Sequence, residues 1–297
     1  MPAKENSEKR AEENIRLAFF LNLIFTIIEF IGGFYTGSLA IIADAVHDMG
    51  DSFSLGLSWI FEHIAKEGRT ERYSYGLKRL SLLSALINAV VLIIGSVFIL
   101  SQAIPRLFVP GEPNAAGMFI LAIFGVIING AAAYRVYGGK SLNEKLVTWH
   151  LLEDFFGWMA VLIVSTIMYF WNLPVLDPIL SIIITIFIFY NVVRNLKEVL
   201  VIFLQGVPRE VSVTEVESAL NNIQDITDVH DIHIWSLDGE HHIITLHVVI
   251  DKNCTFNDIN RIKCSVKRTA KRLGIDHATI EIEKEGELCE MTEDEEY

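Results

Sequence analysis

Long apolar runs alternate with short polar connections over the first two thirds of the chain. A helix needs about 20 apolar residues to cross the hydrocarbon core of a bilayer. Six runs of about this length or longer cover residues 17–35, 38–62, 80–107, 115–134, 146–171 and 178–204. We therefore predict an α-helical membrane protein with six transmembrane helices.

The pattern changes after Gly206-Val207-Pro208 to one typical of a small soluble domain. Amphipathic helical runs alternate with β-rich runs in which polar and apolar residues alternate. Two of the β-rich runs are joined by an Asp238-Gly239 turn. The predicted elements are a helix over 213–222, strands over 229–237 and 242–250, a helix over 257–273 and a strand over 278–283. The order α-β-β-α-β predicts a small α+β domain with its helices on one face of an open sheet. An uncovered face would favour pairing with a second copy of the chain.

Basic residues indicate the orientation in the membrane, because cytoplasmic loops accumulate Lys and Arg. They collect on one side if both termini are cytoplasmic, and the opposite loops then hold only Arg106 near the surface. The predicted parts are a cytoplasmic N-terminal segment over 1–14, a six-helix transmembrane domain over 15–206, a cytoplasmic domain over 207–285 and an acidic tail over 286–297. The first segment has no apolar core or cleavage site and is not expected to be a signal peptide.

The composition agrees with this division, because 52% hydrophobic residues are unusual beside 21% charged residues unless the charges are segregated. The net charge of −13 is concentrated late in the chain, so nucleic acid is not an expected partner. Cys254, Cys264 and Cys289 all fall in the predicted cytoplasmic part, where thiols stay reduced. No disulfide framework is expected.

Two of the predicted spans carry a histidine and an aspartate at the same spacing, His47 with Asp51 and His150 with Asp154. Residues four apart lie on one face of a helix, so each pair presents an imidazole and a carboxylate in the same direction. Together the two helices offer two nitrogens and two oxygens, a tetrahedral set that suits Zn²⁺. Charged groups inside a membrane are costly and usually functional, so this duplication indicates metal transport.

Three other interpretations compete with transport. A single pair at this spacing often occurs by chance on a surface helix, but two copies on two apolar spans make coincidence a poor explanation. An intramembrane zinc hydrolase needs an open coordination position and a general base, often as H-E-x-x-H, and the sequence has no such motif. A membrane-anchored metal sensor would use the histidines of the cytoplasmic domain, although six spans with four buried ligands argue against a simple anchor.

Other acidic residues lie within the predicted spans. Glu29 is expected to relay protons, to line the cavity or to make a helix-packing hydrogen bond. Asp44 is expected either to orient His47 or to lie at the mouth of the cavity. Asp48 and Glu153, which adjoin ligand positions, are predicted to point away from the metal.

Three segments, in the right order, resemble the cation diffusion facilitator family. They are residues 37–51 (GSLAIIADAVHDMGD), 73–79 (YSYGLKR) and 229–235 (VHDIHIW). The resemblance runs from about residue 22 to residue 283. It implies a zinc-exporting secondary transporter with six transmembrane helices and a ferredoxin-like cytoplasmic domain.

The resemblance implies that His47, Asp51, His150 and Asp154 form the transport site. Imidazole suits Zn²⁺ better than Mn²⁺, so Zn²⁺ is the expected substrate, with Cd²⁺ and Co²⁺ as competitors. Neutral imidazoles and ionised carboxylates bind metal, whereas their protonated forms do not, so Zn²⁺ and H⁺ compete for one site. Alternating access would then couple metal efflux to proton entry.

The resemblance also implies a regulatory metal site near the interface of a homodimer. Its expected ligands in the cytoplasmic domain are His230, His247, His277 and Glu283, and Cys289 resembles a tail ligand of some members. Three nitrogen donors on adjacent strands suit zinc, although strand histidines are often merely solvated.

Two other histidines of the cytoplasmic domain are not expected to bind metal. His241 and His242, beside the predicted turn, are expected to be solvated. The resemblance to the family would allow a third metal site, built from Asp and His, in the loop between the second and third spans. Residues 71–77 of this loop contain no histidine, so this site is not expected. The short loops favour a bacterial-type transporter that crosses the plasma (inner) membrane several times.

Overall fold

The computed structural model describes residue 20 and residues 23–65, 68–137 and 142–287. The predicted N-terminal segment, most of the acidic tail and the tail ligand expected at Cys289 lie outside these residues. The chain divides into two compact units, one formed by residues up to 61 with residues 84–195 and the other by residues 62–83 with the residues from 196 onward. Each unit has a hydrophobic core of its own.

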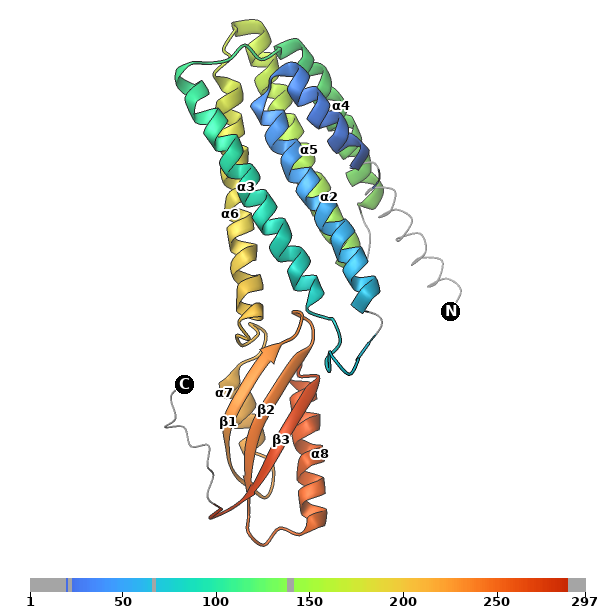
Figure 1. Cartoon of the computed structure of the whole chain (residues 1–297), viewed down its shortest axis with the longest axis vertical. Coiled ribbons are helices and arrows are strands. Elements are labelled where there is room, and N and C mark those ends of the chain that lie inside the picture. Colours follow the sequence, from blue (N-terminus) through green and yellow to red (C-terminus); the bar gives the residue numbers. More distant parts are fainter. Residues whose placement is uncertain (1–19, 21–22, 66–67, 138–141, 288–297) are drawn as a thin grey trace, which may run out of the picture. The chain divides into compact units, whose positions relative to one another are not determined.

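Long helices make up the first unit (Figure 1). In the described residues they are Leu23–Thr36, α2 (Leu39–Ala65), α3 (Leu80–Phe108), α4 (Ala115–Val136), α5 (Leu142–Trp171) and α6 (Leu176–Phe203). Among the residues described, four helices are long and apolar enough to cross a membrane, namely α3, α4, α6 and the part of α5 over Val147–Trp171, which confirms four predicted spans. The helix Leu23–Thr36 is shorter, and three aspartates interrupt the apolar sequence of α2.

The outer surface of these helices is rich in large apolar side chains. Ile94, Phe98, Phe124 and Phe187 are all more than half exposed. Soluble proteins rarely expose apolar patches of this extent to water. A lipid bilayer solvates such side chains, while the helices satisfy their own backbone hydrogen bonds, so the surface fits a membrane protein.

The N-termini of α2 and α6 are joined by the buried carboxylate of Asp177. It accepts hydrogen bonds from the Ser38 hydroxyl and from the backbone N–H groups of Leu39, at 2.8 Å, and Ala40, at 3.2 Å. The first N–H groups of a helix have no partner within the helix, and here another helix caps them. The Ser181 hydroxyl adds a second link by donating to the Leu39 carbonyl at 3.2 Å. The start of α2 is therefore fixed against α6.

A close approach between α4 and α5 places a tryptophan in the core. A Cβ atom at Gly125 would lie 2.1 Å from the indole of Trp158, so the ring fits only against a glycine. Trp158 is fully buried and packs edge-to-face on Phe25 with ring centroids 5.4 Å apart. Its ring N–H donates to Glu29 at 3.2 Å. Helix packing thus fixes the donor that this buried carboxylate uses.

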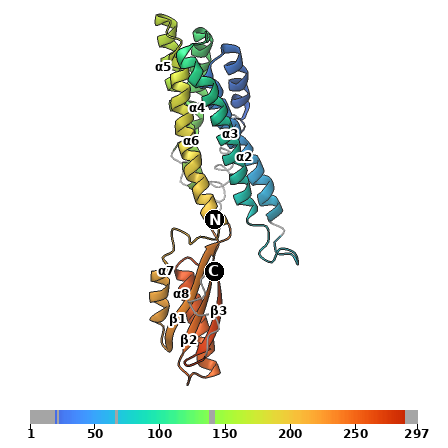
Figure 2. The same ribbon diagram turned by 60° about the vertical axis from the view of Figure 1, so that its left-hand side comes forward.

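The second unit contains a three-stranded sheet with two helices on one face (Figure 2). Its elements are α7 (Val213–Asn221), β1 (Ile226–Ser236), β2 (His242–Ile250), α8 (Phe256–Arg272) and β3 (His277–Lys284). The strand order is β1-β2-β3, with β1 antiparallel and β3 parallel to β2. The predicted order α-β-β-α-β is confirmed, and every predicted boundary lies within three residues of the observed one.

Alternation along β2 gives the sheet two different faces. Ile244, Leu246 and Val248 belong to the core that includes Leu220 of α7 and Ile262 of α8. Successive side chains of a strand point to opposite faces, so the residues between them point away from the helices. This second face carries a cluster of imidazoles and carboxylates.

The carboxylate of Asp238 holds the turn between β1 and β2. Burial acts to raise the pKa of Asp238, but hydrogen bonds from the backbone N–H groups of His241 and Glu240 and from the His241 ring outweigh it and hold the pKa below its usual value. Gly239 adopts a φ of +97°, which favours glycine. The predicted Asp238-Gly239 turn is confirmed.

We expect Asp177→Ala to lower the free energy of unfolding by about 2–4 kcal/mol, because three buried donors would lose their acceptor. Thermal unfolding of the purified protein in detergent measures this loss. Glu112→Ala, which removes an exposed carboxylate, is the matched control. Equal unfolding temperatures for the two variants would contradict the capping role of Asp177.

Candidate metal centre

Helices α2 and α5 bring the two His–Asp pairs together in the helical unit. His47 Nε2 lies 3.7 Å from Asp51 Oδ2, and His150 Nε2 lies 3.7 Å from Asp154 Oδ2. Between the helices, His150 Nδ1 lies 3.7 Å from Asp51 Oδ2, and the two imidazole centroids are 6.1 Å apart. Ligand atoms around a tetrahedral Zn²⁺ with ordinary bond lengths are about 3.3 Å apart. The observed separations are close to those of a metal site.

The ligand atoms form two overlapping groups. His47, Asp51 and His150 make up the first, and Asp48, His150 and Asp154 make up the second, with the atoms of each group within 4.8 Å of one another. His150 belongs to both groups because its ring nitrogens face different carboxylates, Nδ1 toward Asp51 and Nε2 toward Asp154. The structure therefore gathers the other three expected transport residues, and in addition Asp48, around the imidazole of His150.

The two groups differ in burial, and we call them the outer group and the inner group. The side chains of the outer group are partly exposed, by 17% for His47, 28% for Asp51 and 30% for His150. In the inner group Asp48 is fully buried and Asp154 is 3% exposed. Within the described ranges, both oxygens of Asp48 lack a hydrogen-bond partner, and so does Oδ2 of Asp154. Burial of ionised carboxylates in this way is costly unless a cation or a proton accompanies them.

The prediction that Asp48 points away from the metal is wrong. Adjacent residues of a helix are rotated by about 100°, which separates Asp48 from His47. Asp48 and Asp51 are three positions apart, however, and therefore lie on the same side of α2. The spacing to Asp51 was the signal that could have identified Asp48. Glu153 is exposed, as expected for a side chain that points away.

Glu29 and Asp44 are buried in the same unit but belong to neither group. Glu29 Oε1 accepts the hydrogen bond of Trp158, which favours the helix-packing role, and its Oε2 has no partner among the residues described. Asp44 Oδ1 lies against α5, 3.6 Å from the place of a Cβ on Gly157. His47 Nδ1 has no hydrogen-bond partner in the described chain, so Asp44 does not orient His47 through this nitrogen.

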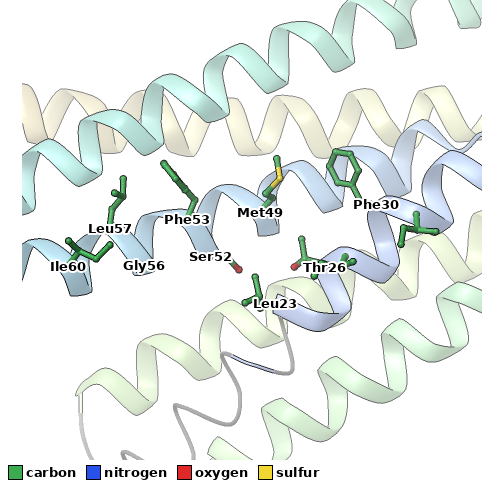
Figure 3. A pocket seen from close by; sticks show the side chains of 11 residues that line it. Leu23, Thr26, Phe30, Met49, Ser52, Phe53, Gly56, Leu57 and Ile60 are labelled. Atoms are coloured by element: carbon green, nitrogen blue, oxygen red, sulfur yellow. The ribbon is translucent and has the colours of Figure 1, made fainter.

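A groove on another face of α2 is apolar (Figure 3). It lies between α2 and the helix Leu23–Thr36 and has a volume of about 680 Å³. Its lining is apolar, as at Phe30, Met49 and Phe53, apart from Thr26 and Ser52, and among the described residues it contains no carboxylate or imidazole. A divalent cation needs such ligands in a low-dielectric setting, so the groove is not part of the ion site.

The polar cluster of the second unit spans all three strands. Strand register places His230 opposite His247 and places His247 opposite Glu281. Glu283 connects the two histidines, since its Oε1 lies 2.6 Å from His247 Nδ1 and its Oε2 lies 3.5 Å from His230 Nε2. The ligand atoms of His230, His247 and Glu283 lie within 4.8 Å of one another. The cluster can offer two nitrogens and one oxygen to a cation.

A β-bulge brings Asp231 into this cluster, which the sequence pattern did not indicate. The register of β1 shifts between His230 and His233, and Asp231 adopts a φ of +50°. Its Oδ2 lies 3.4 Å from His247 Nε2, and Glu281 Oε2 lies 3.5 Å from the same nitrogen. A bulge breaks the simple alternation of a strand, so alternation alone could not place Asp231.

His277 lies outside this cluster, although it was expected to be a ligand. The parallel register places it opposite Ile243, four positions along β2 from His247. The prediction that His242 is solvated is also wrong, because this side chain is buried at the start of β2. His241 is partly exposed and bonds to the turn, as its position suggested.

Comparison with known proteins agrees with this architecture. Residues 15–204 match the family described as "Cation efflux transmembrane domain", and residues 208–285 match "Cation efflux protein, cytoplasmic domain". The chain is 29% identical to the cadmium, cobalt and zinc/H(+)-K(+) antiporter of Bacillus subtilis (strain 168), over 94% of this chain and 92% of the relative.

Two further relatives are named for metal transport or efflux. The zinc transporter ZitB of Yersinia pseudotuberculosis is 30% identical over 82% of this chain and 79% of its own length. The metal cation efflux system protein CzcD of Cupriavidus metallidurans is 30% identical over 92% of this chain and 86% of its own length. These matches confirm the resemblance seen in the sequence and set aside the hydrolase alternative. The chain belongs to the cation efflux family, the cation diffusion facilitators, and is a multi-pass membrane metal transporter rather than an enzyme.

Proposed function

We propose that this protein exports Zn²⁺ from the cytoplasm in exchange for protons, with Cd²⁺ and Co²⁺ as alternative substrates. The observation that carries the proposal is the convergence of His47, Asp51, His150 and Asp154 from two helices of an apolar unit. The name of the Bacillus subtilis relative describes an antiporter of cadmium, cobalt and zinc. Its substrates agree with the donor set of this chain.

The chemistry of the imidazole and carboxylate ligands supports Zn²⁺ as the substrate and H⁺ as the counter-ion. Two imidazoles together with carboxylates suit a borderline-soft cation such as Zn²⁺ better than Mn²⁺. The same groups bind metal only when deprotonated, so each ion that enters displaces protons and each proton that returns displaces metal. Helices that expose such a site first to one side and then to the other would couple the two fluxes.

The topology that fits this function has six membrane crossings. In this arrangement α2 and the helix that includes Leu23–Thr36 cross the bilayer together with the four apolar spans, within a transmembrane domain over 15–206. Both termini and the domain over 207–285 are cytoplasmic, and the membrane is the plasma (inner) membrane. The order α-β-β-α-β is compatible with a ferredoxin-like fold, and the open sheet face favours a homodimer.

The cytoplasmic cluster has a regulatory role in this proposal. His230, His247 and Glu283 would bind Zn²⁺, with Asp231 as a further carboxylate on His247. Binding of Zn²⁺ to this site would regulate the homodimer. The same cluster supports the second candidate function, a membrane-anchored metal sensor.

We expect zinc-driven proton flux in proteoliposomes that contain the native protein. Asp51→Ala and His150→Ala should each lower the zinc and proton fluxes by about 100-fold, because each removes a ligand of the transport site. A zinc-selective dye and a pH-sensitive dye inside the vesicles measure the two fluxes in parallel.

Matched controls for these variants are Glu112→Ala and His63→Ala, whose side chains are exposed. Both controls should transport as the native protein does. Should the native protein bind zinc and move neither ion, the transport proposal fails and the sensor function replaces it. Zinc flux without proton flux would remove the antiport part of the proposal alone.

We expect Glu283→Gln and His247→Ala, each made in the full-length protein, to weaken zinc binding at the site on the sheet by about 10–100-fold. The ions bound at this site should then be lost at zinc concentrations that saturate the native protein. Equilibrium dialysis at a series of zinc concentrations counts the ions bound per chain. His241→Ala, which alters an imidazole at the turn, should bind as many ions as the native protein. Unchanged zinc binding by Glu283→Gln would argue against a metal site on the sheet.

A further inference from the structure

The inner group contains one acidic residue that the proposed transport site does not use. Asp48 is fully buried, and neither of its oxygens has a hydrogen-bond partner in the part of the chain that the structure describes. Its carboxylate lies within 4.8 Å of the ligand atoms of His150 and Asp154. A carboxylate in such a position is stabilised by a bound cation, which its neighbours could also bind.

The shared imidazole cannot serve both groups at the same time. A neutral histidine has one ring nitrogen with a free lone pair and one that carries a proton. An ion on His150 Nδ1, beside Asp51, leaves Nε2–H facing Asp154 Oδ2 at 3.7 Å. An ion on Nε2, beside Asp154, leaves Nδ1–H facing Asp51 Oδ2 at 3.7 Å. A carboxylate beside the second ring N–H is the usual means of orienting a metal-binding histidine, so each group places a carboxylate beside the nitrogen that the other group leaves without metal.

We propose that Asp48, His150 and Asp154 form a second, buried metal position, which an ion enters from the outer group during transport. This inference rests on the proposed function and assigns Asp48 as a ligand of the inner position alone. The partly exposed outer group receives the ion first. The ion then exchanges His47 and Asp51 for Asp48 and Asp154 while it stays beside the same imidazole.

The charges of the two groups support this order. The outer group combines two neutral imidazoles with one carboxylate and leaves a divalent ion with a net charge of +1. The inner group combines one imidazole with two carboxylates and neutralises the ion. Burial of net charge in an apolar interior is costly, so the more deeply buried position requires the fuller compensation. Asp48 supplies the additional negative charge.

Asp48→Asn tests the inference, because it keeps the shape of the side chain and removes its charge. The outer group retains all its ligands, so we expect the KM for zinc transport in proteoliposomes to stay within about threefold of the native value. The maximal rate should fall by about tenfold or more, because the ion loses a ligand of the inner position. Glu153→Gln makes the same chemical change on an exposed side chain next to Asp154 and should transport normally.

Two results would overturn the inner position. A maximal rate for Asp48→Asn equal to that of Glu153→Gln would show that Asp48 is not needed. A rise in KM as large as that of Asp51→Ala would instead indicate one site with five ligands. If Asp48→Asn fails to fold, as judged by size exclusion in detergent, Asp48→Ser replaces it with the same expectations. A native protein that moves no zinc would contradict the proposed function itself, whereas normal native transport with an unaffected Asp48→Asn variant rejects this inference alone.

Discussion

An ionised carboxylate loses several kcal/mol of hydration when it moves from water into an apolar interior. The described part of the helical unit nevertheless buries several acidic side chains, namely Glu29, Asp44, Asp48, Asp154 and Asp177. Asp177 accepts three hydrogen bonds at the start of α2, whereas Asp48 accepts none from the described residues. Hydrogen bonds therefore distinguish a structural carboxylate from one that is free to bind an ion. The helices must be held in place for this difference to persist.

Contacts remote from the metal centre hold the ligand-bearing helices. Asp177 fixes the first turn of α2, the helix that carries His47 and Asp51. The close approach at Gly125 places Trp158 of α5 in the core, in the same cluster as Ala40 and Ile41 of α2. The positions of the ligands thus depend on groups that never contact the ion. Small residues and buried hydrogen bonds are the means by which membrane helices pack, because lipid provides no hydrophobic drive for their association.

The sequence predicts the features that depend on local periodicity. Apolar run lengths and alternation locate the four apolar spans and the elements of the sheet, and the i, i+4 spacing identifies His47, Asp51, His150 and Asp154 as one set. Features that depend on contacts between elements could not be predicted in this way. The role of Asp48 depends on which side of α2 meets α5, and the separation of His277 from His247 depends on the register of β2 with β3. Asp231 enters its cluster through a bulge, which no simple period describes.

The cluster on the sheet and the inner group differ in whether their carboxylates have hydrogen-bond partners, and this difference suits the roles proposed for them. In the sheet, Glu283 and His247 already bond to each other at 2.6 Å, so the cluster has internal partners and metal must compete with them. Such competition lowers affinity and suits a site whose occupancy follows the metal concentration. In the inner group, both oxygens of Asp48 lack partners within the described residues. A metal ion or protons must therefore stabilise the Asp48 carboxylate. An exchange of metal for protons requires such a position, which holds either the metal or protons throughout the transport cycle.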